Sequence, residues 1–387
     1  MDEKVFHKQL VERYAARKAS DQELVVFFEL LIEGKLNEYL TDTFMNAAGI
    51  ESVYLQDAIL PDRLLPAVPD RGKYIIFTRI AVAACILGLI SLIFYFSRDA
   101  EPAKKDYSTL IEPSTPNAGL PPGRIHAILT LADGALVTLD SSSSGTIARQ
   151  GTVMIIKRNL GLVEYQSTTA TLPDETQLYN TITTPRGGEY QVRLPDGTTV
   201  WLNAASTLRF PTAFHANERT VELEGEAYFE VINQPSSPFT VKLKNEVTLK
   251  VLGTRFNVHD YHDGPAKMTL LQGSIFVKAQ RGSAVIKPRQ KVIITNNGEL
   301  NIIHNIDTGQ AVAWKNGLFE FDRADITTIM RQMERWYDVD VIYIGEKSRK
   351  EFVGKMARNS TLTEVLQILE RSNIHFRVEG RKVYVLP

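Results

Sequence analysis

The chain has 387 residues, of which 44 are Lys or Arg and 45 are Asp or Glu, so the net charge of −1 says little about partners. The single cysteine, Cys85, lies in an apolar run. The residues beyond that run therefore form no disulfides and must be held together by ordinary hydrophobic cores. The 290 residues that follow Ser97 are enough for two domains.

The first 40 residues carry helical patterns. Phe6, Leu10 and Tyr14 form an i, i+4, i+8 stripe. Ser20 and Glu23 have the spacing of a capping box, which predicts that a second helix begins there. This second helix, up to Ile32, is apolar on nearly all sides and needs burial on several of them, and Leu36, Tyr39 and Leu40 indicate a third helix.

Residues 1–70 contain 13 acidic and 7 basic residues, a net charge of −6. Because binding to phosphates needs a basic face, we do not expect this head to bind nucleic acid directly. Three short helices cannot build a large core. Two interpretations remain: the head is a small autonomous bundle, or it completes its core against a partner protein.

Residues 80–97 read IAVAACILGLISLIFYFS, an uncharged apolar run. At about 1.5 Å per residue it forms about 27 Å of helix, close to the thickness of a bilayer's hydrocarbon core. A cleaved signal peptide is disfavoured, because the run starts far from the N-terminus and is too long. The run predicts one transmembrane helix, which together with its flanks spans residues 71–98.

Three basic residues, Arg71, Lys73 and Arg79, lie just before the apolar run, whereas Arg98 is soon followed by Asp99 and Glu101. By the positive-inside rule, the N-terminus is cytoplasmic and the C-terminus lies on the opposite side of the membrane. Prolines at both ends of residues 99–122 mark an extended spacer.

Residues 123–312 consist of short alternating runs separated by Asp-Gly, Asn-Gly and Gly turn signals. Two of these runs, Ile128–Asp140 and Val192–Asn203, superpose at an offset of 63 residues with their Asp-Gly turns aligned. The pattern predicts an all-β domain, an antiparallel sandwich or roll.

In residues 313–387 helical stripes return, and the order of elements reads β-α-β-β-α-β-β, which predicts a small α+β domain. The predicted fold class is therefore multidomain: a small all-α cytoplasmic head (1–70), one transmembrane helix (71–98), a spacer (99–122), an all-β periplasmic domain (123–312) and this C-terminal α+β domain (313–387).

Few residues suggest chemistry. His259, Asp260, His262 and Asp263 are the one local cluster of metal-type ligands, and the end of a solvated hairpin is the better interpretation. Glu222, Glu224 and Glu226 alternate along one strand; paired carboxylates could hydrolyse glycosides, but a solvated strand face is far more common. There is neither a nucleophile elbow nor a phosphate-binding Gly-Lys-Ser/Thr loop. We therefore expect no enzyme, no metal and no cofactor.

Several strings occur in the order found in one known family: TPRGGEYQVRLPDGTTVWLNAASTLRFP (Thr184–Pro211), VELEGEAYFEV (Val221–Val231), PFTVK (Pro238–Lys242), VLGTRFNV (Val251–Val258) and LLQGSIFV (Leu270–Val277). They resemble the FecR family of single-pass inner-membrane anti-sigma regulators. The segment Ala313–Val341 and the closing domain look like the secretin/TonB short N-terminal-type module that is often appended to these regulators.

The resemblance implies a relay. An outer-membrane TonB-dependent transporter binds its substrate, its signalling domain contacts the periplasmic part of the regulator, and the cytoplasmic head then controls an extracytoplasmic-function sigma factor. In the family, the signal is usually released by regulated proteolysis, including cleavage by an intramembrane protease.

We hypothesise that Leu24, Phe27, Phe28 and Leu31, which share one face of the second helix, bind the sigma factor. For the outer contact we favour exposed strand edges of the β domain or of the closing α+β module, without naming residues. Two rival functions remain open. A membrane-anchored carbohydrate-binding protein would use aromatic residues such as Trp201, Tyr228 and Tyr261, and a membrane-tethered hydrolase would use the three glutamates.

Overall fold

The computed structural model describes residues 3–40 and 119–386, apart from residues 17, 37–38, 141–143, 159–160, 168–176 and 215–218. The described part of the head contains the helices α1 (Glu3–Ala15) and α2 (Asp21–Ile32), and residues 39–40 are helical as well. The predicted capping box is confirmed, since the Ser20 hydroxyl accepts the backbone N–H of Glu23 and the Glu23 carboxylate accepts that of Ser20 at 2.7 Å. The start of α2 is thus fixed by its own sequence.

The predicted fold class is wrong in its first two parts, the all-α head and the transmembrane helix. No helix among the described residues is long and apolar enough to cross a membrane, and the stretch expected to do so, 71–98, lies outside the described residues. Nor does the head have a core of its own, because its apolar cluster also contains Leu252 and Phe276 of the β domain. Two short helices cannot cover every apolar side of α2, so part of that surface is buried against a sheet.

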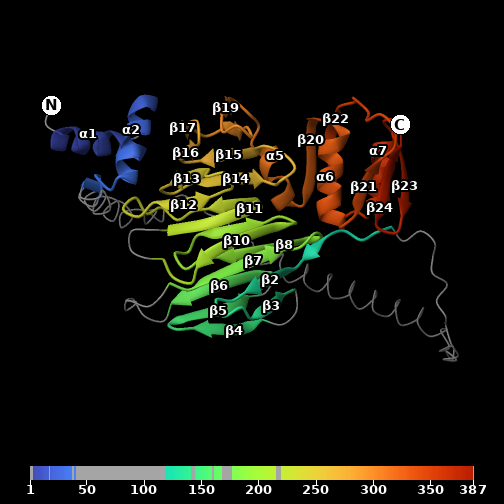
Figure 1. Ribbon diagram of the computed structural model, residues 1–387, viewed down its shortest axis with the longest axis horizontal. Coiled ribbons are helices and arrows are strands. Elements are labelled where there is room, and N and C mark those ends of the chain that lie inside the picture. The colour runs from blue at the N-terminus through green and yellow to red at the C-terminus, as the bar shows by residue number, and fades with distance from the viewer. Residues whose placement is uncertain are drawn as a thin grey trace, which may run out of the picture. The chain divides into compact units, whose positions relative to one another are not determined.

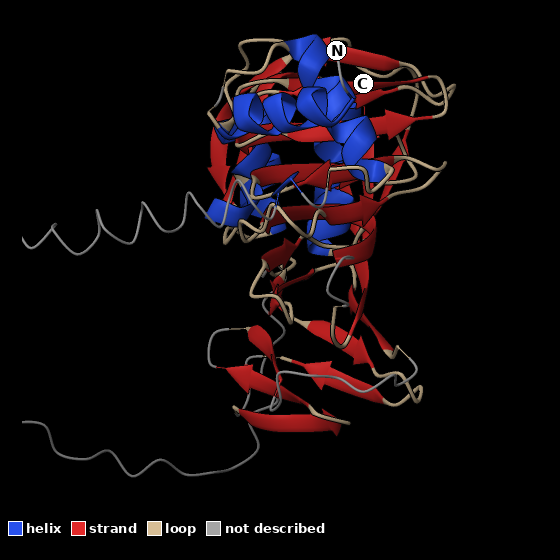
Figure 2. Cartoon of the chain, turned by 90° about the vertical axis from the view of Figure 1, so that its left-hand side faces the viewer, coloured by secondary structure: helices blue, strands red, loops and turns tan. Residues whose placement is uncertain are grey.

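Most of the described chain is β-structure, drawn red in Figure 2, and residues 124–303 form two sheets. The first sheet has, in spatial order, β3 (Leu136–Leu139), β2 (Ala127–Thr130), β7 (Tyr179–Thr184), β10 (Ser206–Pro211), β11 (Arg219–Glu230), β12 (Phe239–Lys242), β13 (Thr248–Val251), β16 (Ile275–Ala279) and β17 (Gly282–Ile286).

The second sheet has, in order, β4 (Gly145–Gln150), β5 (Val153–Arg158), β6 (Leu162–Ser167), β8 (Gly188–Arg193), β9 (Thr199–Leu202), the second half of β11, β14 (Arg255–Asp260), β15 (Ala266–Gln272), β18 (Lys291–Ile294) and β19 (Leu300–Ile303). A short strand, β1 (Arg124–Ile125), pairs with β8 in parallel.

The two sheets share one apolar core, to which the first contributes Leu129 and Leu208 and the second Ile155, Val192 and Phe256, all fully buried. Along strands such as β7 the buried and half-buried residues alternate, as a sheet with one face in a core requires. Most pairings are antiparallel; β1–β8, β6–β8 and β11–β12 are parallel. This part of the chain is an all-β sandwich, as its turn signals and alternation predict.

Strand β11, labelled near the centre of Figure 1, belongs to both sheets. It changes from one sheet to the other at Gly225. Up to Glu224 it pairs with β10, and from Gly225 onward it pairs with β14 and then also with β9. Gly225 has φ of 97°, and a Cβ at this position would lie 2.5 Å from the Ser206 hydroxyl oxygen. Only glycine satisfies both conditions without displacing a neighbour.

The C-terminal module follows a short helix, α5 (Gly309–Val312), and a 3-10 turn, η1 (Trp314–Asn316). Its order is the predicted one: β20 (Leu318–Ala324), α6 (Ile326–Tyr337), β21 (Asp340–Tyr343), β22 (Phe352–Ala357), α7 (Leu362–Glu370), β23 (His375–Glu379) and β24 (Lys382–Leu386). β20 pairs with β22, while β24 lies between β21 and β23. The buried faces of α6 and α7 cover these strands in a second core.

Candidate functional site

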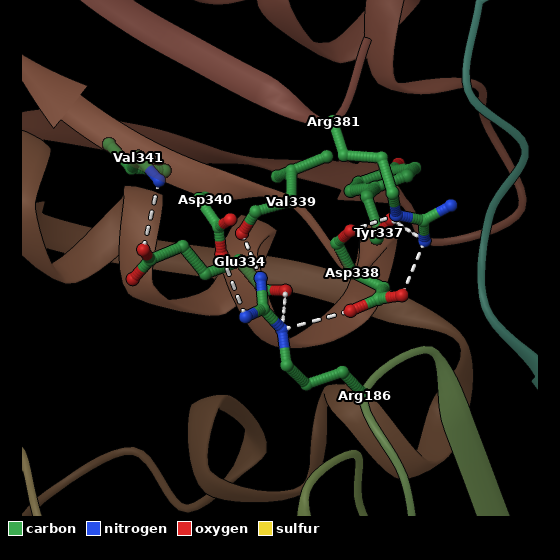
Figure 3. Close-up of polar contacts among 8 residues, drawn as sticks. All are labelled: Arg186, Glu334, Tyr337, Asp338, Val339, Asp340, Val341 and Arg381. Carbon is green, nitrogen blue, oxygen red and sulfur yellow. Dashed lines mark hydrogen bonds and ion pairs between the residues drawn. The ribbon is translucent and has the colours of Figure 1, made fainter.

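The turn between β7 and β8, residues 185–187, contacts the C-terminal end of α6 (Figure 3). Arg186 donates from Nε to the Glu334 carbonyl at 3.2 Å and from Nη2 to the Val339 carbonyl, and the Gly187 N–H donates to the Arg335 carbonyl at 2.7 Å. The last turn of a helix leaves carbonyls without partners and carries partial negative charge. A loop of the β domain thus supplies the donors that α6 lacks.

Two carboxylates complete this contact. The Arg186 guanidinium is 3.0 Å from Asp340 and 3.1 Å from Asp338, and Arg381 approaches the other oxygen of Asp338 at 2.5 Å. Asp338 ends α6 in the left-handed region, with φ of 52°, which turns its carboxylate between the two guanidinium groups. We call Arg186 and its partners the latch between the β domain and the C-terminal module.

A second set of contacts lies on the outer side of α6. The Arg335 guanidinium covers the Tyr261 ring at 4.0 Å and pairs with Asp263 at 2.9 Å, and Arg331 reaches the same carboxylate at 3.3 Å. Asp263 thus binds two arginines. His262, from the same candidate metal cluster, contacts Glu224 at 2.5 Å. No group of ligand-type residues that could hold a metal is assembled in the described part of the chain.

The centre of the junction is a buried polar network. Arg358, 3% exposed, donates from Nη2 to Asn203 at 2.9 Å and lies 3.7 Å from the centre of the Trp336 ring. Glu226 accepts one amide hydrogen bond from Asn203, at 2.8 Å, and another from Asn257, at 3.0 Å. These contacts join Asn203, which follows β9, and residues within β11 and β14 to the C-terminal module.

The network forms the floor of a cleft of about 480 Å³ between the two parts. One wall comes from β14, β15 and β18 and includes His259, Lys267 and Lys291; the other includes Trp314 and residues of α6. Burial lowers the pKa of His259, which favours its neutral form. Burial, followed by the neighbouring Lys291 ammonium, lowers the pKa of Lys267, whereas the carboxylates of Glu226 and Asp263 act in the opposite direction.

The three alternating glutamates lie in three separate environments. Glu222 pairs with Arg209 at 3.1 Å, Glu224 with Lys244 at 3.1 Å, and Glu226 belongs to the buried network. The hydrogen bond from Lys244 lowers the pKa of Glu224 and keeps it ionised. Because the strand changes sheets between the second and third glutamate, they do not form the carboxylate pair that glycoside hydrolysis requires.

The aromatic residues proposed for carbohydrate binding are already covered within the chain. The Lys315 ammonium lies 4.3 Å from the Trp201 ring centre and 5.0 Å from that of Tyr228. Tyr261 is buried beneath Arg335 and donates to the Ala204 carbonyl at 2.7 Å. A sugar stacks on an open aromatic face, and these faces carry cations instead.

The predicted sigma-binding residues do share one side of α2. Phe27, Phe28 and Leu31 are buried and Leu24 is half-buried. Phe27 stacks on Tyr14 of α1 at 4.1 Å, which fixes the pair of helices. Phe28 lies edge-on to Phe27 and also stacks on Phe276 of β16 at 5.6 Å, so one side of its ring is covered by the β domain.

The sequence analysis did not identify the two arginines that hold the junction. Arg186 lies in the string TPRGG, where Gly187 has φ of 74°, so a tight turn could be predicted there but its partner could not. Arg358 has no local signal at all: it follows β22 in an ordinary polar stretch. Its function depends on Asn203, 155 positions earlier in the chain.

The fold and the junction define the structural class of this protein: an all-β sandwich joined to a small α+β module through arginine contacts. The profile described as FecR protein matches residues 180–285, and that described as FecR, C-terminal, matches residues 318–385. None of the curated proteins compared with the chain matches it.

Two crystal structures of a presumed anti-sigma factor from Parabacteroides distasonis, at 1.65 and 2.50 Å resolution, are similar to this chain, each with a TM-score of 0.50. Their identities to it are 31% and 30%; the matches cover 53% and 54% of this chain and 97% and 98% of theirs. The chain belongs to the FecR family.

Proposed function

We propose that the chain is an anti-sigma factor whose head binds an extracytoplasmic-function sigma factor. The described β domain and C-terminal module would receive the signal from the signalling domain of an outer-membrane TonB-dependent transporter. Membership of the FecR family and the likeness to presumed anti-sigma factors support the regulatory role. The proposed sigma-factor contact rests on the apolar face of α2. The described helices of the head do not cover this face completely by themselves, since its apolar cluster also contains Leu252 and Phe276 of the β domain.

The proposal places the head in the cytoplasm and the β domain in the periplasm of a bacterium. In that arrangement Phe28 cannot stack on Phe276, and the sigma factor covers the open side of its ring instead. Reporter fusions after residues 70 and 110 test the placement. Cytoplasmic activity from the first and periplasmic activity from the second are expected, and periplasmic activity from the first contradicts it.

The sigma-factor contact is tested by co-purification of the full chain with the extracytoplasmic-function sigma factors of the same bacterium. Replacing Phe27 and Phe28 with Ser is expected to abolish binding, because the face loses two rings. Since these rings also fix α2 against α1, the half-buried Leu24 provides a milder variant, Leu24→Arg, which is expected to abolish binding while helix content is retained.

Two matched controls accompany these variants. Val26→Ser changes an exposed position of the same helix, and Phe276→Ser removes the partner ring in the β domain. Both are expected to bind normally. Sigma-factor binding that survives in Leu24→Arg and in the double Ser variant rules out this face.

For the transporter contact, we propose the outer edge of β22. Val353 on this strand is 75% exposed, and β20 is its paired neighbour among the described residues. An open edge with an exposed β-branched residue can accept a strand from a partner. Val353→Asp is expected to abolish induction by the transporter while sigma binding persists. Full induction in that variant, and in a chain lacking residues 317–387, would place the contact on the β domain.

A further inference from the structure

The cleft at the junction has the size and position of a ligand site. Its volume of about 480 Å³ lies within the range of small-molecule pockets, which form preferentially between domains. Trp314, Phe319 and Trp336 supply apolar surface, while Asn203 and Glu226 give the floor hydrogen-bonding groups. A molecule in this cleft would contact the β domain and the C-terminal module at the same time.

Arg358 on the floor has two nitrogens without a hydrogen-bond acceptor in the described part of the chain. Its Nη2 donates to Asn203 and lies 3.9 Å from a Glu189 carboxylate oxygen, whereas Nε and Nη1 have no acceptor there, and the side chain is 3% exposed. His259 likewise has a buried Nδ1 without a partner in the described chain. Buried donors without acceptors are uncommon and costly, and a guanidinium is best satisfied by the oxygens of an anion.

The wall formed by the β domain carries two further cations. Lys267 on β15 and Lys291 on β18 lie on paired strands, and neither makes an ion pair with a described residue. Two carboxylates act on Lys267: Glu226, which accepts from two neutral amides, and Asp263, which pairs with Arg331 and Arg335. A ligand anion can therefore pair with these two ammonium groups without breaking an ion pair of the described chain.

The wall formed by the C-terminal module is mixed in charge. Of its carboxylates, Glu320 pairs with Lys355 at 2.9 Å and Asp325 caps α6. Asp307, Asp322 and Glu351 also line the cleft, together with the cations Arg323, Arg335 and Arg349. A ligand is thus attracted toward the floor and the β-domain wall.

We propose that the cleft binds a small organic or inorganic anion, of the carboxylate or phosphate class, between Arg358 and the Lys267–Lys291 pair. Such a ligand binds the folded junction and not the unfolded chain, so it stabilises the two parts together by mass action. The site does not depend on the proposed anti-sigma function. It gives the junction a soluble ligand in addition to any protein partner.

The test is calorimetric titration and thermal unfolding of the full-length chain with citrate and, separately, with inorganic phosphate, at constant ionic strength. A saturable one-site heat and a matching rise in melting temperature are expected with at least one probe; citrate alone identifies a carboxylate site and phosphate alone a phosphate site. The double variant Lys267→Gln/Lys291→Gln is expected to bind at least about tenfold more weakly, the loss expected for a charge-assisted hydrogen bond.

Lys278→Gln, an exposed lysine on β16 away from the cleft, is the matched control and is expected to bind like the unaltered chain. Arg358→Lys keeps the buried charge but removes the guanidinium fork, and is expected to weaken binding while the chain stays folded. The absence of a saturable signal at millimolar citrate and phosphate overturns the proposal. Equal affinity in the double lysine variant and in the control also overturns it.

Discussion

Replacing Arg186 with Ala tests whether the latch holds the C-terminal module to the β domain. The substitution removes the hydrogen bonds to the Glu334 and Val339 carbonyls and the ion pairs with Asp338 and Asp340. It leaves the cores of both parts untouched, because the side chain lies at the surface of the junction, 36% exposed. The expected effect is therefore a loss of coupling between two folded parts.

The magnitude follows from these contacts. Hydrogen bonds from a charged donor contribute about 1.5 kcal/mol or more each, and the freed carbonyls can still reach water, so the two together account for about 2 kcal/mol. The partly exposed ion pairs add about 0.5 kcal/mol each at most. We expect the C-terminal module to lose about 2–3 kcal/mol, which corresponds to a fall of about 1 M in its urea midpoint.

Tryptophan fluorescence is a suitable readout, because Trp314 and Trp336 both lie at the junction. In urea, the tryptophan fluorescence of the unaltered chain is expected to change in one transition. In Arg186→Ala this transition is expected at a lower urea concentration. Arg186→Lys keeps the charge without the fork and should fall between them. Arg281→Ala is the control, since its pair with Glu299 is about 60% exposed on both sides and contributes little. Equal midpoints for Arg186→Ala and Arg281→Ala would refute the latch.

Two further predictions concern single residues. Gly225→Ala should destabilise the β domain by at least about 2 kcal/mol in urea unfolding, because of its positive φ and the nearby Ser206. Gly264→Ala should change little, because the new Cβ would make only an ordinary contact with the end of the Arg331 side chain, at 3.9 Å, and its φ is not positive. Asp325→Ala should cost about 1 kcal/mol at pH 7 through the lost cap of α6. The hydrogen bond from the Thr328 N–H lowers the pKa of Asp325 in the folded chain. The part of the stabilisation that depends on the charged carboxylate is therefore fully present above the unfolded-state pKa. It is lost as the pH falls through the lower, folded-state pKa. A variant deficit that is the same at pH 7 and at pH 3 would contradict that reasoning.

Structural features that depend on residues a few positions apart were predicted correctly from the sequence. The Ser20 capping box starts α2, and the Asp-Gly turns at Gly134 and Gly197 close the hairpins β2–β3 and β8–β9. The φ angles of these two glycines are 85° and 87°. Only glycine adopts such positive angles readily, which explains why it follows the aspartate in both turns. Such elements form from contacts between residues a few positions apart, so a single sequence contains what is needed to predict them.

Contacts between distant residues were not predictable. Glu222 and Glu226 were expected on one strand face, yet they lie in different sheets because Gly225 bends the strand between them. The head was expected to be a separate all-α unit, but its apolar cluster extends into the β domain. Alternation along a strand says which residues share a side, and it does not say where the strand changes partners.

By itself the sequence determined the period-2 strands, their glycine turns, the capped helices and the family strings. These follow from φ preferences, side-chain alternation and capping, which act over a few residues. The tertiary structure alone decided that Arg186 completes the end of α6, and that Arg358 lies over Trp336, beside the cleft, with two nitrogens that have no acceptor among the described residues. The function of a charged side chain depends on the groups that the fold brings within hydrogen-bonding distance. For Arg186 and Arg358 those partners are about 150 positions away in the sequence.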